Sequence, residues 1–293
     1  MHFVDAKHLL QPGNGMNIYR GCTHGCIYCD SRSTCYQMKH AFEDIEVKRN
    51  APQLLEKELR QKRQRCMIGT GAMCDPYMHC EETLMLTRQC LQLIADHGFG
   101  LAVQTKSDRI LRDIELLDRI NRQSRCVVQM TLTTYDEALC AILEPDVCTT
   151  RRRYEALREM HARGIPTVVW MTPILPFIND TPENIRALVE LCADAGVMGI
   201  IYFGAGTTIR DGDREYFFAA LDRHFPGMKQ RYLKRYGNAY ECMSDRDPEL
   251  TALFHQLCEQ HRIIHSNREL FTYMHTYPSK EPACEQLSMF DLP

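Results

Sequence analysis

The chain has 293 residues, with 35 Lys and Arg against 38 Asp and Glu, a formal net charge of -3, 44% hydrophobic residues and 25% charged residues. These proportions are those of an ordinary globular protein and exclude disordered, collagen-like and low-complexity classes. The longest run without a charged residue, 164–179, is short and interrupted by prolines, so no membrane span is expected. The N-terminal segment lacks the apolar stretch of a signal peptide, which favours a cytoplasmic protein.

Strand-like runs recur along the chain and are separated by helical patterns. The runs lie at residues 16–20, 66–71, 100–106, 126–133, 166–172 and 199–204. Between them, apolar side chains recur at helical spacing. Thr181-Pro182 is typical of a helix start, and Gly98, Gly164 and Gly196 each follow a helical pattern and precede a strand, as C-cap glycines do.

Repeated strand–helix units predict an α/β fold in which helices cover parallel strands. About six such units predict an incomplete (β/α)6 barrel, similar to a TIM barrel, over residues 1–215. Beyond it, helical patterns without strands predict a small helical C-terminal lobe at 216–280, followed by a tail at 281–293. In such barrels the functional side chains lie at the C-terminal ends of the strands.

Fifteen cysteines are many for a chain with no secretion signal. Their number is odd and their spacings do not repeat, which argues against a disulfide scaffold. Cys66, Cys90, Cys126 and Cys192 lie where a small hydrophobic residue would fit, so we expect them in the core.

One group of cysteines is different, in the segment NIYRGCTHGCIYCDSRSTCYQ. Cys22, Cys26 and Cys29 form C-x3-C-x2-C, and Cys35 follows. Gly21, just before the motif, and Gly25, inside it, would let the chain loop around one centre. Thiolates select zinc or an iron–sulfur cluster over magnesium or calcium. With Cys35, four thiolates would close a structural zinc site, whereas three alone would hold a 4Fe-4S cluster with one iron open to another ligand.

The motif resembles that of the radical SAM superfamily, in which C-x3-C-x-aromatic-C binds a 4Fe-4S cluster whose open iron chelates S-adenosylmethionine (SAM). The resemblance implies that Cys22, Cys26 and Cys29 are the cluster ligands and that Tyr28 lies beside the adenine of SAM. It also implies the family's barrel and reductive cleavage of SAM to methionine and a 5′-deoxyadenosyl radical. An electron donor, which the sequence does not identify, would be needed.

Three further segments, GTGAMCDPYMHCEETLMLTRQ, VQTKSDRILRDIELL and ILEPDVCTTRRR, resemble the spore photoproduct lyase-like branch of this superfamily. The spore enzyme itself reverses a thymine dimer in DNA. The resemblance covers most of residues 16–196 and implies that Lys106 contacts the carboxylate of SAM. It further implies that Cys74, Asp75 and Thr131 lie near SAM.

Two departures from the spore enzyme concern its radical chemistry. That enzyme has a tyrosine directly after the third cluster cysteine, where this chain has Asp30. Its hydrogen-donor cysteine lies close to the end of the second strand, near Cys74 but out of register with it. A hydrogen-donor role for Cys74 is therefore a hypothesis. In the alternative, Cys74 is a thiol that lies beside SAM and takes no part in the redox chemistry. Thymine-dimer reversal itself is open.

The C-terminal tail contains a pentapeptide, QLSMF, similar to the one by which bacterial repair enzymes bind the DNA sliding clamp. Leu287 and Phe290 would enter a hydrophobic pocket on the clamp, with Met289 between them and Gln286 bonded at the rim. In the alternative interpretation, Leu287, Met289 and Phe290 fold back onto the barrel and seal its core.

The charge pattern does not by itself indicate nucleic acid, because a pI near 6.5 gives no overall basic footprint. Basic runs occur at 62–65, 151–153 and 229–237. Residues 151–153 begin a helix after the fourth strand, so they could meet phosphates on the active-site side or form a solvated helix start.

These patterns together predict a radical SAM enzyme, using a 4Fe-4S cluster and SAM, that acts on DNA in photoproduct-lyase-like repair. The alternatives are radical modification of RNA, a peptide or a small metabolite, or a non-catalytic iron–sulfur adaptor or sensor bound to the clamp.

Overall fold

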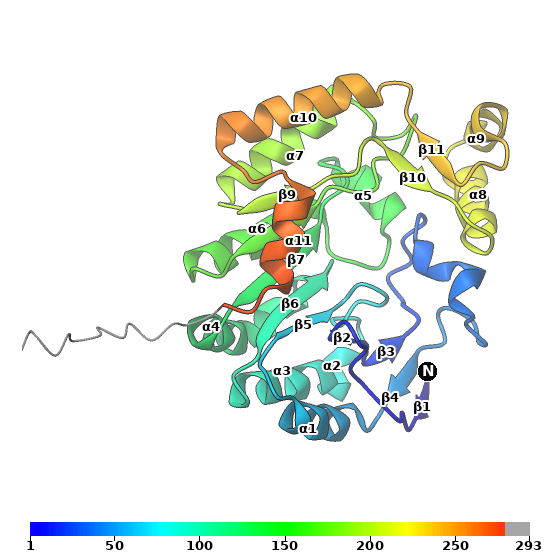
Figure 1. The fold of residues 1–293 in the computed structure, drawn as a ribbon. Coiled ribbons are helices and arrows are strands. Elements are labelled where there is room, and N and C mark those ends of the chain that lie inside the picture. Colours follow the sequence, from blue (N-terminus) through cyan, green and yellow to red (C-terminus); the bar gives the residue numbers. More distant parts are fainter. Residues whose placement is uncertain (279–293) are drawn as a thin grey trace, which may run out of the picture.

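The computed structural model describes residues 1–278, and its centre is a six-stranded sheet (Figure 1). All neighbouring strands run parallel, in the order β2-β5-β6-β7-β8-β9, which is also the chain order. The strands are β2 (Gly15–Met16), β5 (Met67–Thr70), β6 (Gly100–Thr105), β7 (Cys126–Thr131), β8 (Thr167–Trp170) and β9 (Gly199–Ile201). Since β9 does not pair with β2, the predicted incomplete barrel is confirmed.

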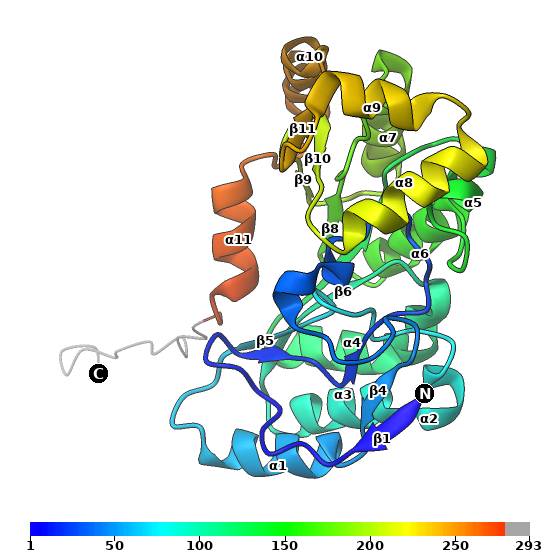
Figure 2. The same cartoon turned by 90° about the vertical axis from the view of Figure 1, so that its right-hand side faces the viewer.

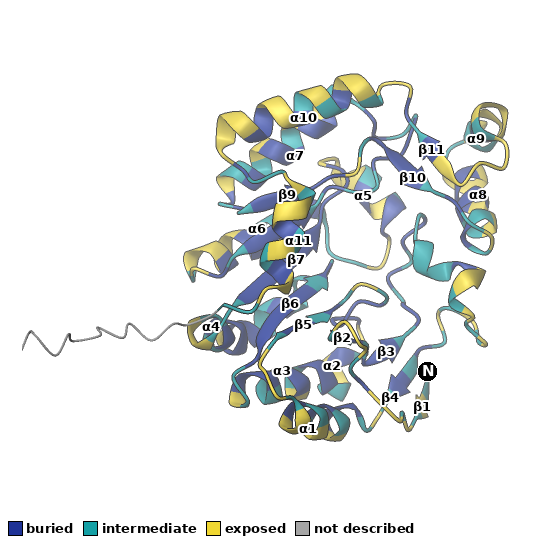
Figure 3. Cartoon of the chain, viewed as in Figure 1, coloured by how far each residue is buried: buried dark blue, intermediate teal, exposed yellow. Residues whose placement is uncertain are grey.

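Helices cover the outer face of this sheet, and each helix has one buried face and one exposed face (Figures 1 and 3). Each crossover contributes apolar side chains to one large core, including the fully buried Leu91, Leu117, Leu157 and Leu188. The helices are α1 (Ala51–Gln61), α2 (Glu81–Leu84), α3 (Leu86–Asp96), α4 (Ile114–Gln123), α5 (Glu137–Leu143), α6 (Thr150–Ala162) and α7 (Pro182–Asp194), with short 3-10 turns η1 (Asp30–Arg32), η2 (Thr34–Tyr36) and η3 (Asp108–Asp113).

The helix boundaries follow the capping signals in the sequence. The hydroxyl of Thr181 accepts a hydrogen bond from the Asn184 amide at 3.2 Å, and Pro182 is the first residue of α7. The three predicted C-cap glycines, after α3, α6 and α7, all have φ of +68°. Of the four cysteines expected in the core, Cys90, Cys126 and Cys192 are fully buried and Cys66 packs against the core.

The first predicted strand, 16–20, is divided between two sheets. β2 joins the central sheet, whereas β3 (Tyr19–Arg20) pairs antiparallel with β4 (Glu46–Lys48) in a three-stranded sheet completed by β1 (His2–Val4). The chain leaves β5 after Met16 because the next residues bond to β4, where the Lys48 amide donates to the Ile18 carbonyl. A run of apolar residues does not reveal such a change of partner.

The helices predicted beyond residue 215 are present, but the absence of strands there was wrong. They are α8 (Asp213–His224), α9 (Met228–Tyr236) and α10 (Asp247–His261), and β11 (Glu241–Met243) pairs antiparallel with β10 (Gly206–Thr208). Three residues are too few to show an alternating pattern. α10 packs on α7, as Figure 2 also shows, and contributes Leu250 and Phe254 to the main core.

A fourth C-terminal helix, α11 (Asn267–His275), was not predicted. It crosses the inner face of the sheet (Figure 1), where Leu270 and Met274 belong to one buried cluster with side chains of five strands. These are Met67, Ala102, Val127, Val168 and Ile201. Because most of them lie at or next to strand starts, α11 fills the inside of the open barrel at the end away from the C-terminal strand ends.

Candidate functional site

A cavity of about 790 Å³ opens at the C-terminal ends of the central strands. Each strand or the segment after it contributes to the wall, and β10 and β11 form the outer side. The lining includes Cys22, Cys26, Tyr28 and Cys29 from the loop after β3, Gly71 to Asp75 after β5, Thr105 and Lys106 at the end of β6, Thr131 of β7, Trp170 of β8, Phe203 after β9, and Thr207 and Met243 of the outer strands.

The cysteine loop is held in place by main-chain hydrogen bonds from the first cysteine and from inside the motif. The Cys22 amide donates to the Phe42 carbonyl at 3.1 Å, and the Ile27 amide donates to the Leu143 carbonyl at 3.0 Å. Gly21 has φ of +89°, and a Cβ there would lie 2.4 Å from the Phe42 oxygen, so a side chain is excluded. The loop therefore turns as its glycines predict and brings its three cysteines to one cavity wall.

The three thiols form a soft donor set with no disulfide among them. Burial raises the pKa of Cys22 to about 12 and also raises that of Cys26, so both thiols are protonated near neutral pH without a ligand and would release protons on binding one. Three thiolates in one cavity fit an iron–sulfur cluster with one iron open. Cys35 is exposed, does not line the cavity and accepts a hydrogen bond from Arg210. The structure thus favours three cysteine ligands over a closed zinc site.

Lys106 places a cation in the same cavity. Its ammonium nitrogen lies 5.9 Å from the centre of the Tyr28 ring. Burial lowers the pKa of Lys106, but the negative charge of Cys26 when it is ionised and that of Glu144 raise it by more, so the net shift is upward and the side chain stays charged. The cation is suited to a ligand carboxylate.

Beneath Tyr28 lies a buried ion pair that the sequence did not reveal. Glu144 accepts a hydrogen bond from the Tyr28 hydroxyl and lies 2.5 Å from the Arg153 guanidinium, both residues being almost completely buried. Burial raises the pKa of Glu144, but Arg153 and Lys106 lower it overall. Arg153 also donates to the Thr131 carbonyl at 2.9 Å, so the pair joins the cysteine loop to the end of β7.

This pair corrects one interpretation of residues 151–153. Arg153 is neither solvated nor open to phosphates, because Glu144 and main-chain carbonyls occupy it. Arg151 and Arg152 are exposed but pair with Glu155. The only sequence signal for Glu144 was its place inside ILEPDVCTTRRR, since a single buried pair has no periodicity.

The side chains of Cys74 and Asp75, which follow β5, form hydrogen bonds to neighbouring parts of the chain. The carboxylate of Asp75 accepts hydrogen bonds from the Thr105 hydroxyl and the Lys106 amide, both at 2.7 Å, and lies 3.4 Å from His24. Asp75 thereby ties the ends of β5 and β6 to the cysteine loop. The Cys74 thiol donates to the Tyr19 carbonyl at 2.8 Å and is buried at the cavity wall.

The rim carries the residue that departs from the spore enzyme. Asp30 accepts a hydrogen bond from the Tyr36 hydroxyl at 2.8 Å and lies 3.1 Å from Arg210. Tyr36 itself lines the cavity. Phe203 lines it as well and is 55% exposed, with its ring centre 6.2 Å from that of Trp170.

Comparisons with known proteins agree with this geometry. The model of the radical SAM superfamily matches residues 16–192, more than half of the chain. The chain therefore belongs to the radical SAM superfamily, whose enzymes use a 4Fe-4S cluster and SAM, and its three-cysteine cavity fits those cofactors. The clamp-binding prediction concerns Gln286, Leu287, Met289 and Phe290. These residues lie outside the described part of the chain, so it stays a prediction.

Among solved structures, spore photoproduct lyase complexed with a dinucleoside spore photoproduct matches with a TM-score of 0.60 at 14% identity, covering 83% of this chain and 72% of that one. A radical SAM methyltransferase, TsrM from Kitasatospora setae, matches with a TM-score of 0.57 at 13% identity, covering 87% and 54%. At these identities the matches show a shared fold.

Relatives by sequence are uncharacterised proteins. One from Mycobacterium bovis is 29% identical over 234 residues. The match covers 75% of this chain and 66% of that protein, which is slightly under two thirds of its length. One from Methanocaldococcus jannaschii is 30% identical over 168 residues, covering 56% of this chain and 61% of the other. Within residues 1–278, no helix has both the length and the apolar character needed to cross a bilayer.

Proposed function

We propose that this radical SAM enzyme cleaves SAM reductively and acts on DNA, in a repair reaction of the photoproduct-lyase type. The observation that carries the proposal is the meeting of three free thiols, Tyr28 and the Lys106 cation in one cavity at the C-terminal strand ends. When bound there, the cluster and SAM would supply the electron transfer and radical chemistry.

The chain's own residues would bind and orient these groups. Cys22, Cys26 and Cys29 would hold the cluster, and Lys106 would pair with the carboxylate of SAM. Glu144 fixes the Tyr28 hydroxyl and thereby the ring that would lie against the adenine. Asp75 and Thr131 line the cavity, and their hydrogen bonds to Thr105 and Arg153 hold the ends of the strands in place. There they would help to keep water away from the bound groups.

DNA as the substrate is supported by the similarity to spore photoproduct lyase and by the shape of the rim. Phe203 presents more than half of its surface beside the cavity, next to Trp170. Aromatic side chains so exposed stack on unpaired bases regardless of sequence. A modified RNA, peptide or small metabolite is the alternative, and the fold shared with a methyltransferase leaves room for it.

The test is anaerobic cluster reconstitution followed by reduction with SAM, with 5′-deoxyadenosine measured in the presence and absence of ultraviolet-damaged DNA. We expect release that rises with damaged DNA and is abolished in Cys29→Ala. Release that is indifferent to DNA would support another substrate. No release from a fully loaded cluster would support a non-catalytic adaptor or sensor.

A hydrogen-donor role for Cys74 is the finer part of the proposal. The thiol borders the cavity and donates a hydrogen bond to the Tyr19 carbonyl. Cys74→Ala should retain SAM cleavage but give side adducts in place of clean product. Clean product from this variant would exclude the role.

We also propose that the pentapeptide in the tail binds a bacterial sliding clamp. Two apolar anchors, Leu287 and Phe290, with Gln286 fit the mode in which a short segment fills a hydrophobic pocket. Clamp capture in a pull-down should be lost in Leu287→Ala/Phe290→Ala with unchanged thermal stability. A loss of thermal stability with clamp capture retained would show instead that the tail packs on the barrel.

A further inference from the structure

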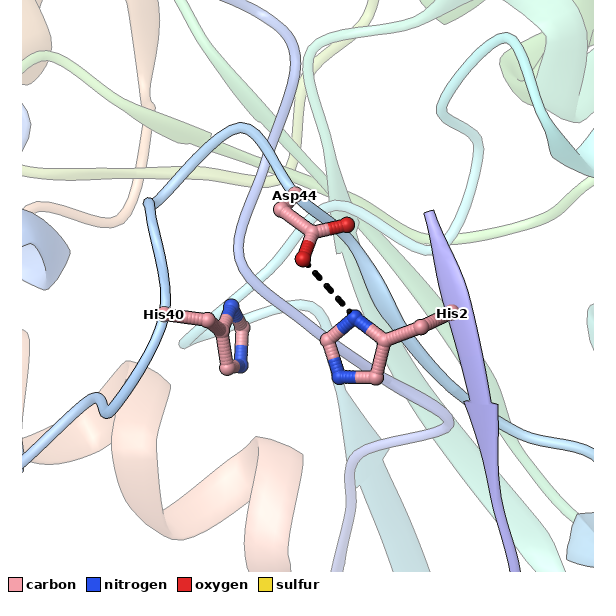
Figure 4. Close-up of side chains that lie close together, drawn as sticks. All are labelled: His2, His40 and Asp44. Atoms are coloured by element: carbon pink, nitrogen blue, oxygen red, sulfur yellow. Dashed lines mark hydrogen bonds and ion pairs between the residues drawn. The ribbon is translucent and has the colours of Figure 1, made fainter.

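A second group of metal-ligating side chains lies away from the cavity, beside the three-stranded sheet (Figure 4). His2 is on β1, and His40 and Asp44 lie in the segment that leads into β4. One ligating atom from each lies within 4.8 Å of the other two. Figure 4 shows both imidazole rings and the carboxylate turned toward one another.

The hydrogen bonding of His40 leaves one ring nitrogen available. Its Nδ1 lies 3.0 Å from the Ala41 carbonyl oxygen, which can only accept, so Nδ1 carries the proton in the neutral ring. Its Nε2 is buried and has no hydrogen-bond partner. Metal-binding histidines commonly donate the other ring N–H to a carbonyl in this way. The Glu46 carboxylate lies 3.8 Å from the same Nε2.

The other two groups are held close together by the sheet and by their own contacts. His2 Nδ1 lies 2.9 Å from Asp44 Oδ2, and the Met1 amino group lies 2.7 Å from Oδ1. The rings of His2 and His40 meet edge to face with their centres 4.8 Å apart.

We propose that His2, His40 and Asp44 bind a divalent transition metal of the zinc class. Two imidazoles and one carboxylate are a donor set that zinc accepts, whereas magnesium and calcium prefer oxygen ligands alone. Glu46 or a water molecule would complete the coordination. Binding would replace the direct His2–Asp44 contact with one bond from each residue to the ion. The ligating atoms, which lie within 4.8 Å of one another, would then move closer together.

The metal would fasten the far end of the cysteine loop. Residues 40–44 are the return path of that loop to β4, and the Phe42 carbonyl in their middle accepts the hydrogen bond from Cys22. A metal ion joining His40 and Asp44 to β1 would thus fix the backbone that holds the first cysteine of the motif. This role is structural and independent of the substrate.

The experiment uses the cluster-loaded protein, kept anaerobic, with any tag placed at the C-terminus and free of histidine and cysteine. Zinc is titrated against a chromophoric chelator, and bound zinc is examined by X-ray absorption at its own edge, which iron does not obscure. The variants are His40→Ala and Asp44→Asn, and the control is His8→Gln, because His8 is an exposed histidine near the same terminus with only a 3.8 Å contact to Glu58.

We expect one tight zinc equivalent in the wild type and in His8→Gln, with nitrogen and oxygen ligands and the outer scattering of imidazole. His40→Ala and Asp44→Asn should each weaken binding at least about tenfold. Equal zinc affinity in all four proteins, a sulfur ligand shell or no tight equivalent in the wild type would each overturn the proposal. None of these readouts depends on SAM cleavage or DNA.

Discussion

At the scale of single residues, the site depends on groups that do not themselves face a ligand. Glu144 has its charge balanced by Arg153 and its remaining oxygen occupied by the Tyr28 hydroxyl. Breaking a buried pair by removing one charge leaves the other without compensation, which costs far more than the pair contributes when intact. The Glu144–Arg153 pair therefore orients Tyr28, and its loss would also lower the free energy of unfolding.

Glu144→Gln should destabilise the protein by about 3–5 kcal/mol at pH 7, because Arg153 stays buried without its counterion. Urea denaturation followed by circular dichroism measures the change. Glu155→Gln, which removes a partner from the exposed Arg152, should cost less than about 1 kcal/mol and serves as the control. Similar losses in the two variants would contradict the assignment of a buried, essential pair.

The same pair predicts a dependence on pH. The pKa of Glu144 in the folded protein is below its ordinary value of 4.5, so its ionised form stabilises the fold. That contribution is complete above pH 4.5 and is lost as the pH falls through the folded pKa. The difference in unfolding free energy between wild type and Glu144→Gln should therefore shrink on acidification. A difference that grew below pH 4.5 would reverse the sign assigned here.

Gly71, at the turn from β5 into the cavity wall, should not tolerate a side chain. Its φ is +101°, and a Cβ would lie 1.9 Å from the Gln104 carbonyl oxygen of β6, which the sheet holds in place. Gly71→Ala should lose about 1–3 kcal/mol from the backbone conformation, with the clash in addition. In Gly69→Ala a Cβ meets nothing within 4 Å, so this variant should unfold at nearly the wild-type temperature. A stable Gly71→Ala would show that this turn can move.

At the scale of elements, the helix α11 covers the inner face of the sheet, and its sequence gives no sign of this role. Its segment is short and follows a lobe with no repeated strand–helix unit, so nothing in the pattern shows that it returns to the barrel. The apolar inner faces of β5 to β9 need a cover where no ligand lies. Leu270 and Met274 provide it.

Leu270→Ala should therefore destabilise the whole barrel, by about 2–5 kcal/mol, since the side chain is completely buried against several strands. Thermal unfolding gives the change, and Arg268→Ala on the exposed side of the same helix is the matched control. If α11 only rested on the surface, both variants would unfold close to the wild type.

At the scale of the whole molecule, periodic features were predictable and single contacts were not. The order of six parallel strands, the helix caps and the cysteine loop could be predicted because each repeats a local rule of spacing or capping. The split of β2 from β3, the pairing of β11 with β10, and the Glu144–Arg153 pair could not. They are set by partners distant in the chain, and each involves too few residues to leave a pattern.

The charge distribution leads to a final prediction about DNA. The net charge is -3, and the basic run at 62–65 precedes β5, at the end opposite the cavity. If DNA binds at the cavity, Arg210, which lies 3.1 Å from Asp30 at the rim, is a candidate phosphate partner. Two or three phosphate contacts give a slope of about 2–3 for log Kd against log salt concentration.

Fluorescence anisotropy with a damaged oligonucleotide measures this slope. Arg210→Ala should weaken binding and lower the slope by about 1, because one phosphate contact is lost. Arg63→Glu, at the opposite end of β5, should leave both the affinity and the slope unchanged. The reverse outcome, with Arg63→Glu weakening binding and Arg210→Ala neutral, would place DNA on the far end of the barrel, where no radical formed at the cysteine loop could reach it.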